Sequence, residues 1–210
     1  MENLKMNPEV DTQNYSKSSL HLPSSLRELR IAACQAKSTQ VRERTLSEII
    51  ADLSKPIPLG LISLKPITKK INNEVVVLKR VPYIKVYILS AIFDYICPGW
   101  EKKDQADYMG SEVCVKTTLI IHASDGSFSR DAFGTEPVSS KAYGGPLLSA
   151  SAQSFRRAAS LFGLGKYFYH DGTAQATVKK IFAQSQTNEK NDNEQERDYV
   201  DNLSLSNYHD

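Results

Sequence analysis

The chain has 210 residues, of which 40% are hydrophobic and 24% are charged, a composition typical of a globular protein. This length is enough for one domain with a hydrophobic core. No hydrophobic run approaches the roughly 20 residues of a membrane-spanning helix. The first ten residues lack the pattern of a secretory signal, so we expect a cytoplasmic protein.

The charges divide the chain into a basic body and an acidic tail. The net charge is only +2, yet residues 189–210 carry seven acidic and two basic residues. This arrangement is common among nucleic-acid-binding proteins. We expect a polar, disordered segment over residues 1–42, one folded domain over 43–183, and a disordered acidic tail over 184–210.

The N-terminal half predicts two helices and a hairpin. Residues 26–32 fit a short helix. Leu46, Ile49, Ile50 and Leu53 share one face of another, with Thr45 as its N-cap and Glu48 completing a capping box. Residues 61–68 and 74–80 then read as strands, and Asn72-Asn73 suits the turn between them.

A helix and three strands follow. Hydrophobic residues recur at helical spacing from Ile84 to Tyr95, and Pro98-Gly99 ends that helix. Residues 100–107 predict an edge strand. Residues 113–122 and 128–133 predict a hairpin around the Asp125-Gly126 turn. A long loop, residues 134–145, leads to the last long helix.

That helix, residues 147–162, shows two faces. Its predicted hydrophobic stripe comprises Leu148, Ala152, Phe155, Ala159 and Phe162. Gln153, Arg156, Arg157 and Ser160 lie on the other side. If the stripe packs on a sheet, the two adjacent arginines point away from it, where an anion can reach them.

Several catalytic signatures are absent from the sequence. It has no phosphate-binding P-loop, no Gly-x-Ser-x-Gly elbow and no His-Glu-x-x-His motif. Cys34, Cys97 and Cys114 are far apart, which argues for free thiols and against a zinc site. Asp131 and Glu136 are the best pair for a metal-dependent nuclease, although an exposed strand and loop is the better explanation for them. We therefore expect no enzyme, no cofactor and no metal.

The order of these motifs resembles the single-strand annealing domain of the Rad fifty-two superfamily, in particular its bacterial and phage, DdrA-like branch. The resemblance covers about residues 46–169. The motifs that carry it are Tyr83-Ile84, Pro98-Gly99-Trp100, the turn at residues 124–127, Lys141-Ala142, and residues 152–165, AQSFRRAASLFGLG.

The resemblance implies an α+β fold in which a curved antiparallel sheet, a β-β-β-α core, packs against a long helix. It also implies DNA-binding residues. The paired basic residues of the family match Arg156 and Arg157, the loop lysine matches Lys141, and Lys85 is an approximate counterpart at the Tyr-Ile helix. A family cation one turn later is replaced by Ser160. The remaining candidate DNA-binding residues are Lys102, Lys103, Lys116 and Tyr143.

From this resemblance we expect ATP-independent binding of single-stranded DNA and annealing of complementary strands in recombinational double-strand break repair. The expected assembly is a homo-oligomeric ring, nucleoid-associated in a bacterial or phage-infected cell. A single-strand-binding protein or a recombinase is a candidate partner for the acidic tail. The alternatives are a protein that protects DNA 3′ ends without annealing, or the nuclease described above.

Overall fold

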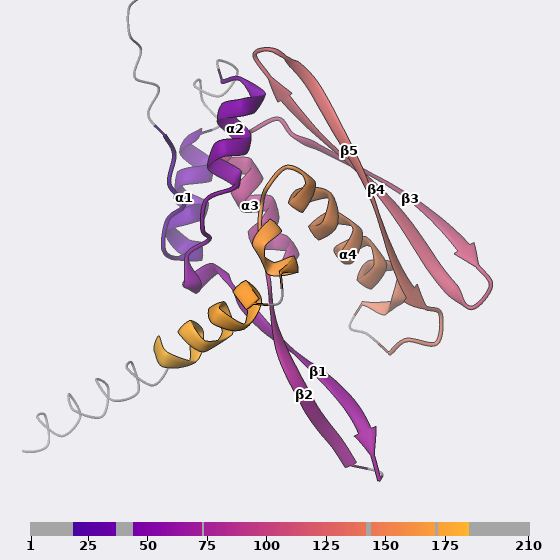
Figure 1. The fold of residues 1–210 in the computed structure, drawn as a ribbon. Helices are drawn as coiled ribbons and strands as arrows, with labels where there is room; N and C mark the ends of the chain where they lie inside the picture. The colour runs from indigo at the N-terminus through magenta and orange to yellow at the C-terminus, as the bar shows by residue number, and fades with distance from the viewer. Residues whose placement is uncertain (1–18, 37–43, 73, 142–143, 171, 185–210) are drawn as a thin grey trace, which may run out of the picture.

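One face of a three-stranded antiparallel sheet is covered by a long helix (Figure 1). The computed structural model describes residues 19–36, 44–72, 74–141, 144–170 and 172–184. The strands are β3 (Glu101–Met109), β4 (Glu112–Ala123) and β5 (Gly126–Pro137), and the helix is α4 (Gly145–Leu161). The expected α+β class and the β-β-β-α order are confirmed.

The central strand β4 defines the two faces of this sheet. Its buried side chains alternate with less buried ones, because successive side chains of a strand point to opposite faces. Val113, Val115, Thr117, Leu119 and Ile121 are buried on the face that α4 covers, which we call the inner face. The register assigns every side chain of β3 and β5 to the inner or the outer face.

Helix α4 lies unusually close to strand β5 at Gly134. A β-carbon at this glycine would lie 2.7 Å from the backbone nitrogen of Ser154 and closer still to the carbonyl oxygen of Ala150. Ala150 and Ser154, the small helix residues at this contact, are fully buried, and so is Ala158 one turn later. At Gly134, strand β5 therefore accepts only small side chains of α4.

This close contact changes the predicted hydrophobic stripe. Phe155, Ala159 and Phe162 are buried as expected, but Leu148 is 61% exposed and its place is taken by Ala150 and Ser154. The prediction for Leu148 was wrong because hydrophobic periodicity favours large residues, whereas the glycine in β5 selects small ones.

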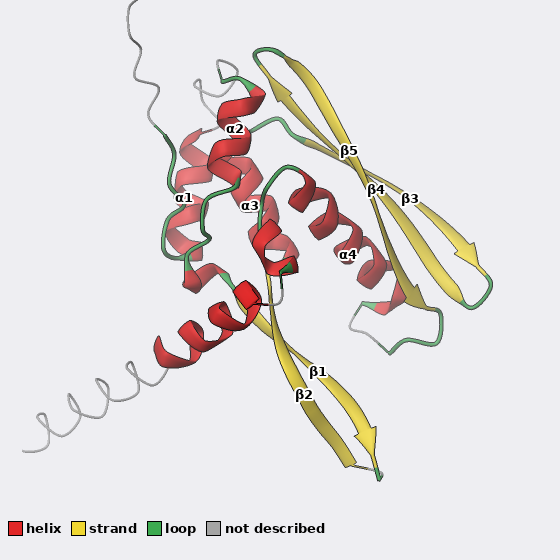
Figure 2. Ribbon diagram, in the orientation of Figure 1, coloured by secondary structure: helices red, strands yellow, loops and turns green. Residues whose placement is uncertain are grey.

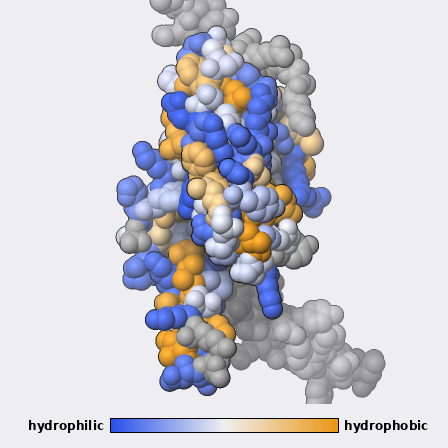
Figure 3. Space-filling model, turned by 90° about the vertical axis from the view of Figure 1, so that its right-hand side faces the viewer, coloured by the Kyte–Doolittle hydropathy of each residue, from blue (hydrophilic) through white to orange (hydrophobic). Residues whose placement is uncertain are grey.

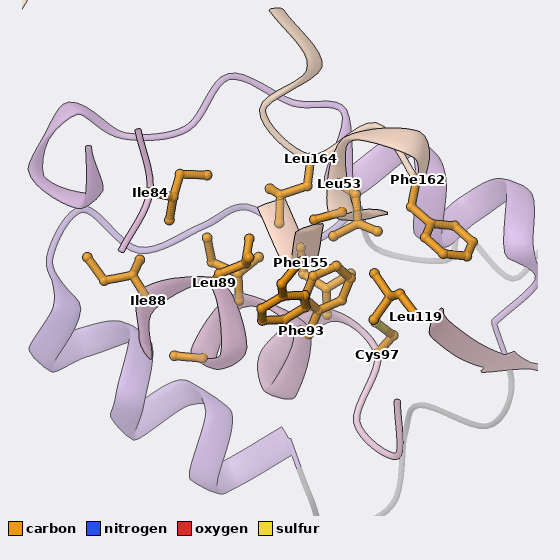
Figure 4. Close-up of a cluster of buried hydrophobic side chains, with 14 of the residues drawn as sticks. Leu53, Ile84, Ile88, Leu89, Phe93, Cys97, Leu119, Phe155, Phe162 and Leu164 are labelled. Carbon is orange, nitrogen blue, oxygen red and sulfur yellow. The ribbon is translucent and has the colours of Figure 1, made fainter. Parts of the chain in front are cut away.

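Three further helices enclose the core beside the sheet. They are α1 (Leu26–Ala36), α2 (Leu46–Leu53) and α3 (Val86–Ile96). Figure 4 shows side chains of α3 and α4 meeting at Phe93 and Phe155. Trp100 completes this group, with ring centroids 5.2 Å from Phe93 and 5.4 Å from Phe155. None of the described helices is long and hydrophobic enough to cross a membrane.

A two-stranded hairpin projects from this body (Figure 2). It consists of β1 (Ser63–Ile71) and β2 (Glu74–Tyr83), and Asn72 adopts the left-handed geometry expected at its turn, with φ of 49°. Its tip is exposed, including Val75 at 70%. In Figure 3 hydrophobic residues lie among hydrophilic ones on the sheet side of the molecule and again on this lower projection. A last helix, residues 172–184, follows the turn at Lys166–Tyr169.

The ordered body begins before the boundary expected at residue 43. Helix α1 packs on α3 and buries Leu29 completely, so this helix is part of the folded domain. Ser19 and the amide of Leu20 donate hydrogen bonds to Asp52 of α2. This tertiary contact is invisible in a polar stretch of sequence. Residues 1–18, 37–43 and 185–210 lie outside the described residues, and the expectations for them stay predictions.

Asp52 holds the N-terminal segments to α2. Its buried carboxylate pairs with Arg44 and, at 2.6 Å, with Nζ of Lys55. Burial by itself raises the pKa of Asp52, but the hydrogen bonds from Lys55 and Leu20 and the charge of Arg44 outweigh it, so the pKa lies below its usual value. The folded state thus favours the charged form.

The Gly134→Ala substitution should destabilise the protein by roughly 1–3 kcal/mol, because its methyl group overpacks the contact with α4. Thermal unfolding followed by circular dichroism measures the change. Gly172→Ala is the matched control, since a β-carbon there meets no atom within 4 Å. Equal melting temperatures for both variants would contradict the close contact.

The Asp52→Asn substitution should cost roughly 3 kcal/mol at neutral pH, because it leaves two cations without their buried counterion. With its lowered pKa, the carboxylate stabilises the fold above about pH 4, the ordinary unfolded-state pKa. That contribution is lost as pH falls through the folded-state pKa. Denaturant unfolding across this range should show the variant and the wild type converging at low pH.

Asp107→Asn provides the control, since Asp107 is exposed and its carboxylate accepts a hydrogen bond from the amide of Tyr108. It should leave the free energy of unfolding at neutral pH nearly unchanged. An Asp52→Asn protein as stable as this control at neutral pH would show that the buried pairs contribute nothing.

Candidate nucleic-acid interface

A cavity of about 220 Å³ lies where the end of β2, the start of α3, the second half of α4 and the turn at Lys166–Tyr169 meet. Its lining is hydrophobic and aromatic except for one cation, Arg156. The lining residues are Val81, Pro82, Tyr83, Ile84, Leu89, Arg156, Leu164, Gly165, Phe168 and Tyr169. A hydrophobic cavity with a single charged group suits a ligand that carries both a flat ring and an anion.

Arg156 is half-buried and rests on an aromatic ring. Its Cζ lies 5.7 Å from the centroid of the Tyr83 ring, within the range of a cation–π interaction. Burial lowers the pKa of Arg156, and the neighbouring Tyr169 and Tyr83 partly offset this effect. Arginine nonetheless stays charged at neutral pH. No hydrogen bond or ion pair joins Arg156 to another described residue, so its guanidinium donors are available to an anion.

The second arginine of the pair points elsewhere. Arg157 is exposed, and its Nη1 donates a hydrogen bond of 2.6 Å to the carbonyl oxygen of Phe133 in β5. Neighbouring residues of a helix point about 100° apart, which explains the divergence. Ser160 donates to the carbonyl of Arg157 at 2.7 Å. The expectation that both arginines point away from the sheet was therefore wrong for Arg157, which contacts strand β5.

Three candidate lysines are paired with acids of the sheet. Lys102 is on the inner face, where it pairs with Asp104 and donates to Ser151 at 3.1 Å. On the outer face, Lys103 pairs with Glu101 at 3.0 Å and Lys116 with Asp131 at 2.9 Å. None of these lysines lines the cavity that contains Arg156.

Lys85 and Lys141 are exposed. Lys85 caps the start of α3, two residues after Tyr83, and its Nζ lies 5.8 Å from the centroid of the Tyr87 ring. Lys141 lies in the loop before α4. Tyr143, the remaining candidate, lies outside the described residues.

The sequence pattern did not single out Tyr83 as a partner of Arg156. These residues are on different elements, and only packing of α4 against the end of β2 brings them together.

The two tyrosines that follow α4 have different roles. Tyr167 accepts a hydrogen bond from the amide of Ile57 at 2.9 Å, which makes it structural, whereas Tyr169 lines the cavity and is 59% exposed.

The nuclease hypothesis required Asp131 and Glu136 to converge on a metal. The register places Asp131 opposite Thr118 on the outer face and Glu136 opposite Val113 on the inner face. Glu136 accepts hydrogen bonds from Ser149 and Gln153 of α4, at 3.1 and 2.8 Å. The two carboxylates thus do not share a site. Within the described part of the chain, no three His, Cys, Asp or Glu residues are placed to hold a metal ion.

Two curated proteins of Arabidopsis thaliana are similar to this chain. "DNA repair RAD52-like protein 1, mitochondrial" is 29% identical over 131 residues, which are 61% of this chain and 69% of that protein. "DNA repair RAD52-like protein 2, chloroplastic" is 30% identical over 132 residues, 61% of this chain and 62% of that protein. No family model matches the chain, and no solved structure matches it.

The homologues of this chain are therefore RAD52-like DNA repair proteins, which supports the resemblance to the Rad fifty-two superfamily. Both are plant proteins with organellar names. The bacterial and phage, DdrA-like branch and the cytoplasmic location stay predictions.

Proposed function

We propose that this chain is a DNA repair and recombination protein of the RAD52 superfamily that binds single-stranded DNA and anneals complementary strands without ATP. Two independent observations support the proposal. The similar proteins are named as DNA repair proteins, and the cavity presents an unpaired, half-buried arginine between exposed and half-buried tyrosines.

The cavity offers what a single strand needs for binding without sequence preference. Arg156 can donate two parallel hydrogen bonds to a phosphate, and the partly desolvated site strengthens that charge-assisted contact. Tyr83 and Tyr169 carry flat rings on which any base can stack, worth roughly 1–3 kcal/mol per base. None of these contacts reads the edge of a base, so the edges stay free to pair with a second strand.

This arrangement also fits the wider expectations from the sequence. A binding protein that leaves the bases accessible promotes annealing through binding energy alone. The proposed function therefore requires neither ATP hydrolysis nor covalent catalysis. Assembly of copies into a ring would extend the site along the strand. We propose that the acidic tail, which lies outside the described residues, contacts a single-strand-binding protein or a recombinase.

The Arg156→Ala variant should bind a single strand at least about tenfold more weakly, because it loses a charge-assisted contact worth roughly 1.5–3 kcal/mol. Its annealing rate should fall as well. Fluorescence anisotropy with labelled oligothymidylate measures binding, and recovery of duplex from two labelled complementary strands measures annealing.

Lys103→Ala is the matched control, because it also removes one positive charge but from the outer face. It should change binding and annealing little. If Lys103→Ala impairs binding and Arg156→Ala does not, the strand lies on the sheet and the assignment of the cavity is wrong.

The same experiment separates annealing from protection of 3′ ends. A protein that only shields ends binds the strand but leaves the rate of duplex formation at its spontaneous value. If the wild type binds the strand tightly but does not accelerate annealing, the function is protection of 3′ ends and the proposal of annealing is wrong.

A further inference from the structure

A second cluster of unpaired cations surrounds Tyr87 at the start of α3. The Cζ of Arg30, from α1, and the Nζ of Lys85 each lie 5.8 Å from the centroid of the Tyr87 ring. Arg30 and Lys85 are exposed, and Tyr87 is 47% exposed. Two positive charges are thus held at one accessible aromatic ring.

The acids closest in sequence to these cations are engaged elsewhere. Glu28, the acid of α1, accepts hydrogen bonds from Ser24 at 3.0 Å and from the amide of Ser25 at 3.3 Å. Asp94 of α3 accepts from the indole of Trp100 at 3.1 Å. In the described part of the chain, no carboxylate forms an ion pair with Arg30 or Lys85. Because an aromatic ring attracts cations without neutralising them, the positive potential is retained at the surface.

The cluster continues the cavity of Arg156. Tyr83 and Ile84 line that cavity, Lys85 follows directly, and Tyr87 lies in the first turn of α3. Helix α1 packs along α3 (Figure 1). This packing brings Arg30 beside Tyr87. The order across the surface is therefore Arg156 on Tyr83, then Lys85, then Arg30 on Tyr87. A single strand, with a phosphate at every nucleotide, requires such a row of cations.

We propose that Arg30 joins Lys85, which the resemblance already assigns to DNA binding, in a second phosphate subsite. The ring of Tyr87 positions this subsite, which carries the bound single strand from the cavity onto α1. This inference rests on the proposed function, since it assigns a further subsite to the same ligand. Arg30 and Lys85 contact the phosphate. Tyr87 is a positioning residue, because it holds the two cations near one another against their mutual repulsion.

The test combines salt dependence with strand length. In a variant with Arg30→Gln and Lys85→Gln, the affinity for a long oligothymidylate should fall about tenfold, roughly the effect of one charge-assisted hydrogen bond. The slope of log affinity against log salt should decrease by about 0.7, the value for one phosphate contact on a single strand. The shortest oligothymidylate that the wild type binds, which occupies the cavity alone, should bind both proteins equally.

The control carries Lys179→Gln and Lys180→Gln, which removes the same two charges from exposed positions of the last helix. It should keep the wild-type slope. Tyr87→Leu should weaken the binding of long strands, and Tyr87→Phe, which retains the ring, should restore it. A general loss of positive potential would not distinguish these two variants.

The outcomes separate the subsite from the proposed function. One outcome is that the wild type binds long strands, that Arg156→Ala weakens this binding, and that the Arg30–Lys85 double variant matches the lysine control in affinity and slope. The subsite then does not exist, and the proposed function stands. If the wild type binds no single strand at all, both proposals fail. Circular dichroism of each variant confirms that these exposed substitutions leave the fold intact.

Discussion

The contact between α4 and the three-stranded sheet determines where the cations of α4 point. Ala150 and Ser154 approach the backbone at Gly134, and Phe155 stacks on Trp100 with an interplanar angle of 10°. These contacts fix the rotation of the helix about its axis. Arg156, the next residue after Phe155, is thereby turned toward Tyr83, and a helix rotated by one residue would aim it at the sheet.

Cations on the two sides of the molecule have different partners. Lys103 and Lys116, on the outer face of the sheet, are each paired with a carboxylate and contribute little net potential. Those around the junction of β2 and α3, including Arg156 and Lys85, rest on tyrosine rings. Aromatic partners fix the position of a cation but leave its charge available. The cations at this junction thus keep their charge available to a ligand, although the net charge of the chain is only +2.

The sequence predicted the elements well and their side-chain partners poorly. Alternation in β4 and the turn at residues 124–127 are local signals. Both are confirmed in the β4–β5 hairpin, where Ser124 and Asp125 connect the strands and Gly126 opens β5. The left-handed Asn72 is confirmed for the same reason. By contrast, the burial of Leu29 and the exposure of Leu148 depend on tertiary contacts with α3 and β5. The pairing of Lys116 in β4 with Asp131 in β5 and the stacking of Arg156 on Tyr83 likewise join residues of different elements, which no local pattern identifies.

The central claim is that a single strand lies in the cavity beside α4 and not on the open face of the sheet. Photocrosslinking of thiothymidine-containing single strands, followed by mapping of the modified peptides, tests it directly. The account predicts adducts at Tyr83 and Tyr169, whose rings line the cavity. Adducts confined to the outer face of β3–β5, for example at the exposed Phe133, would contradict it.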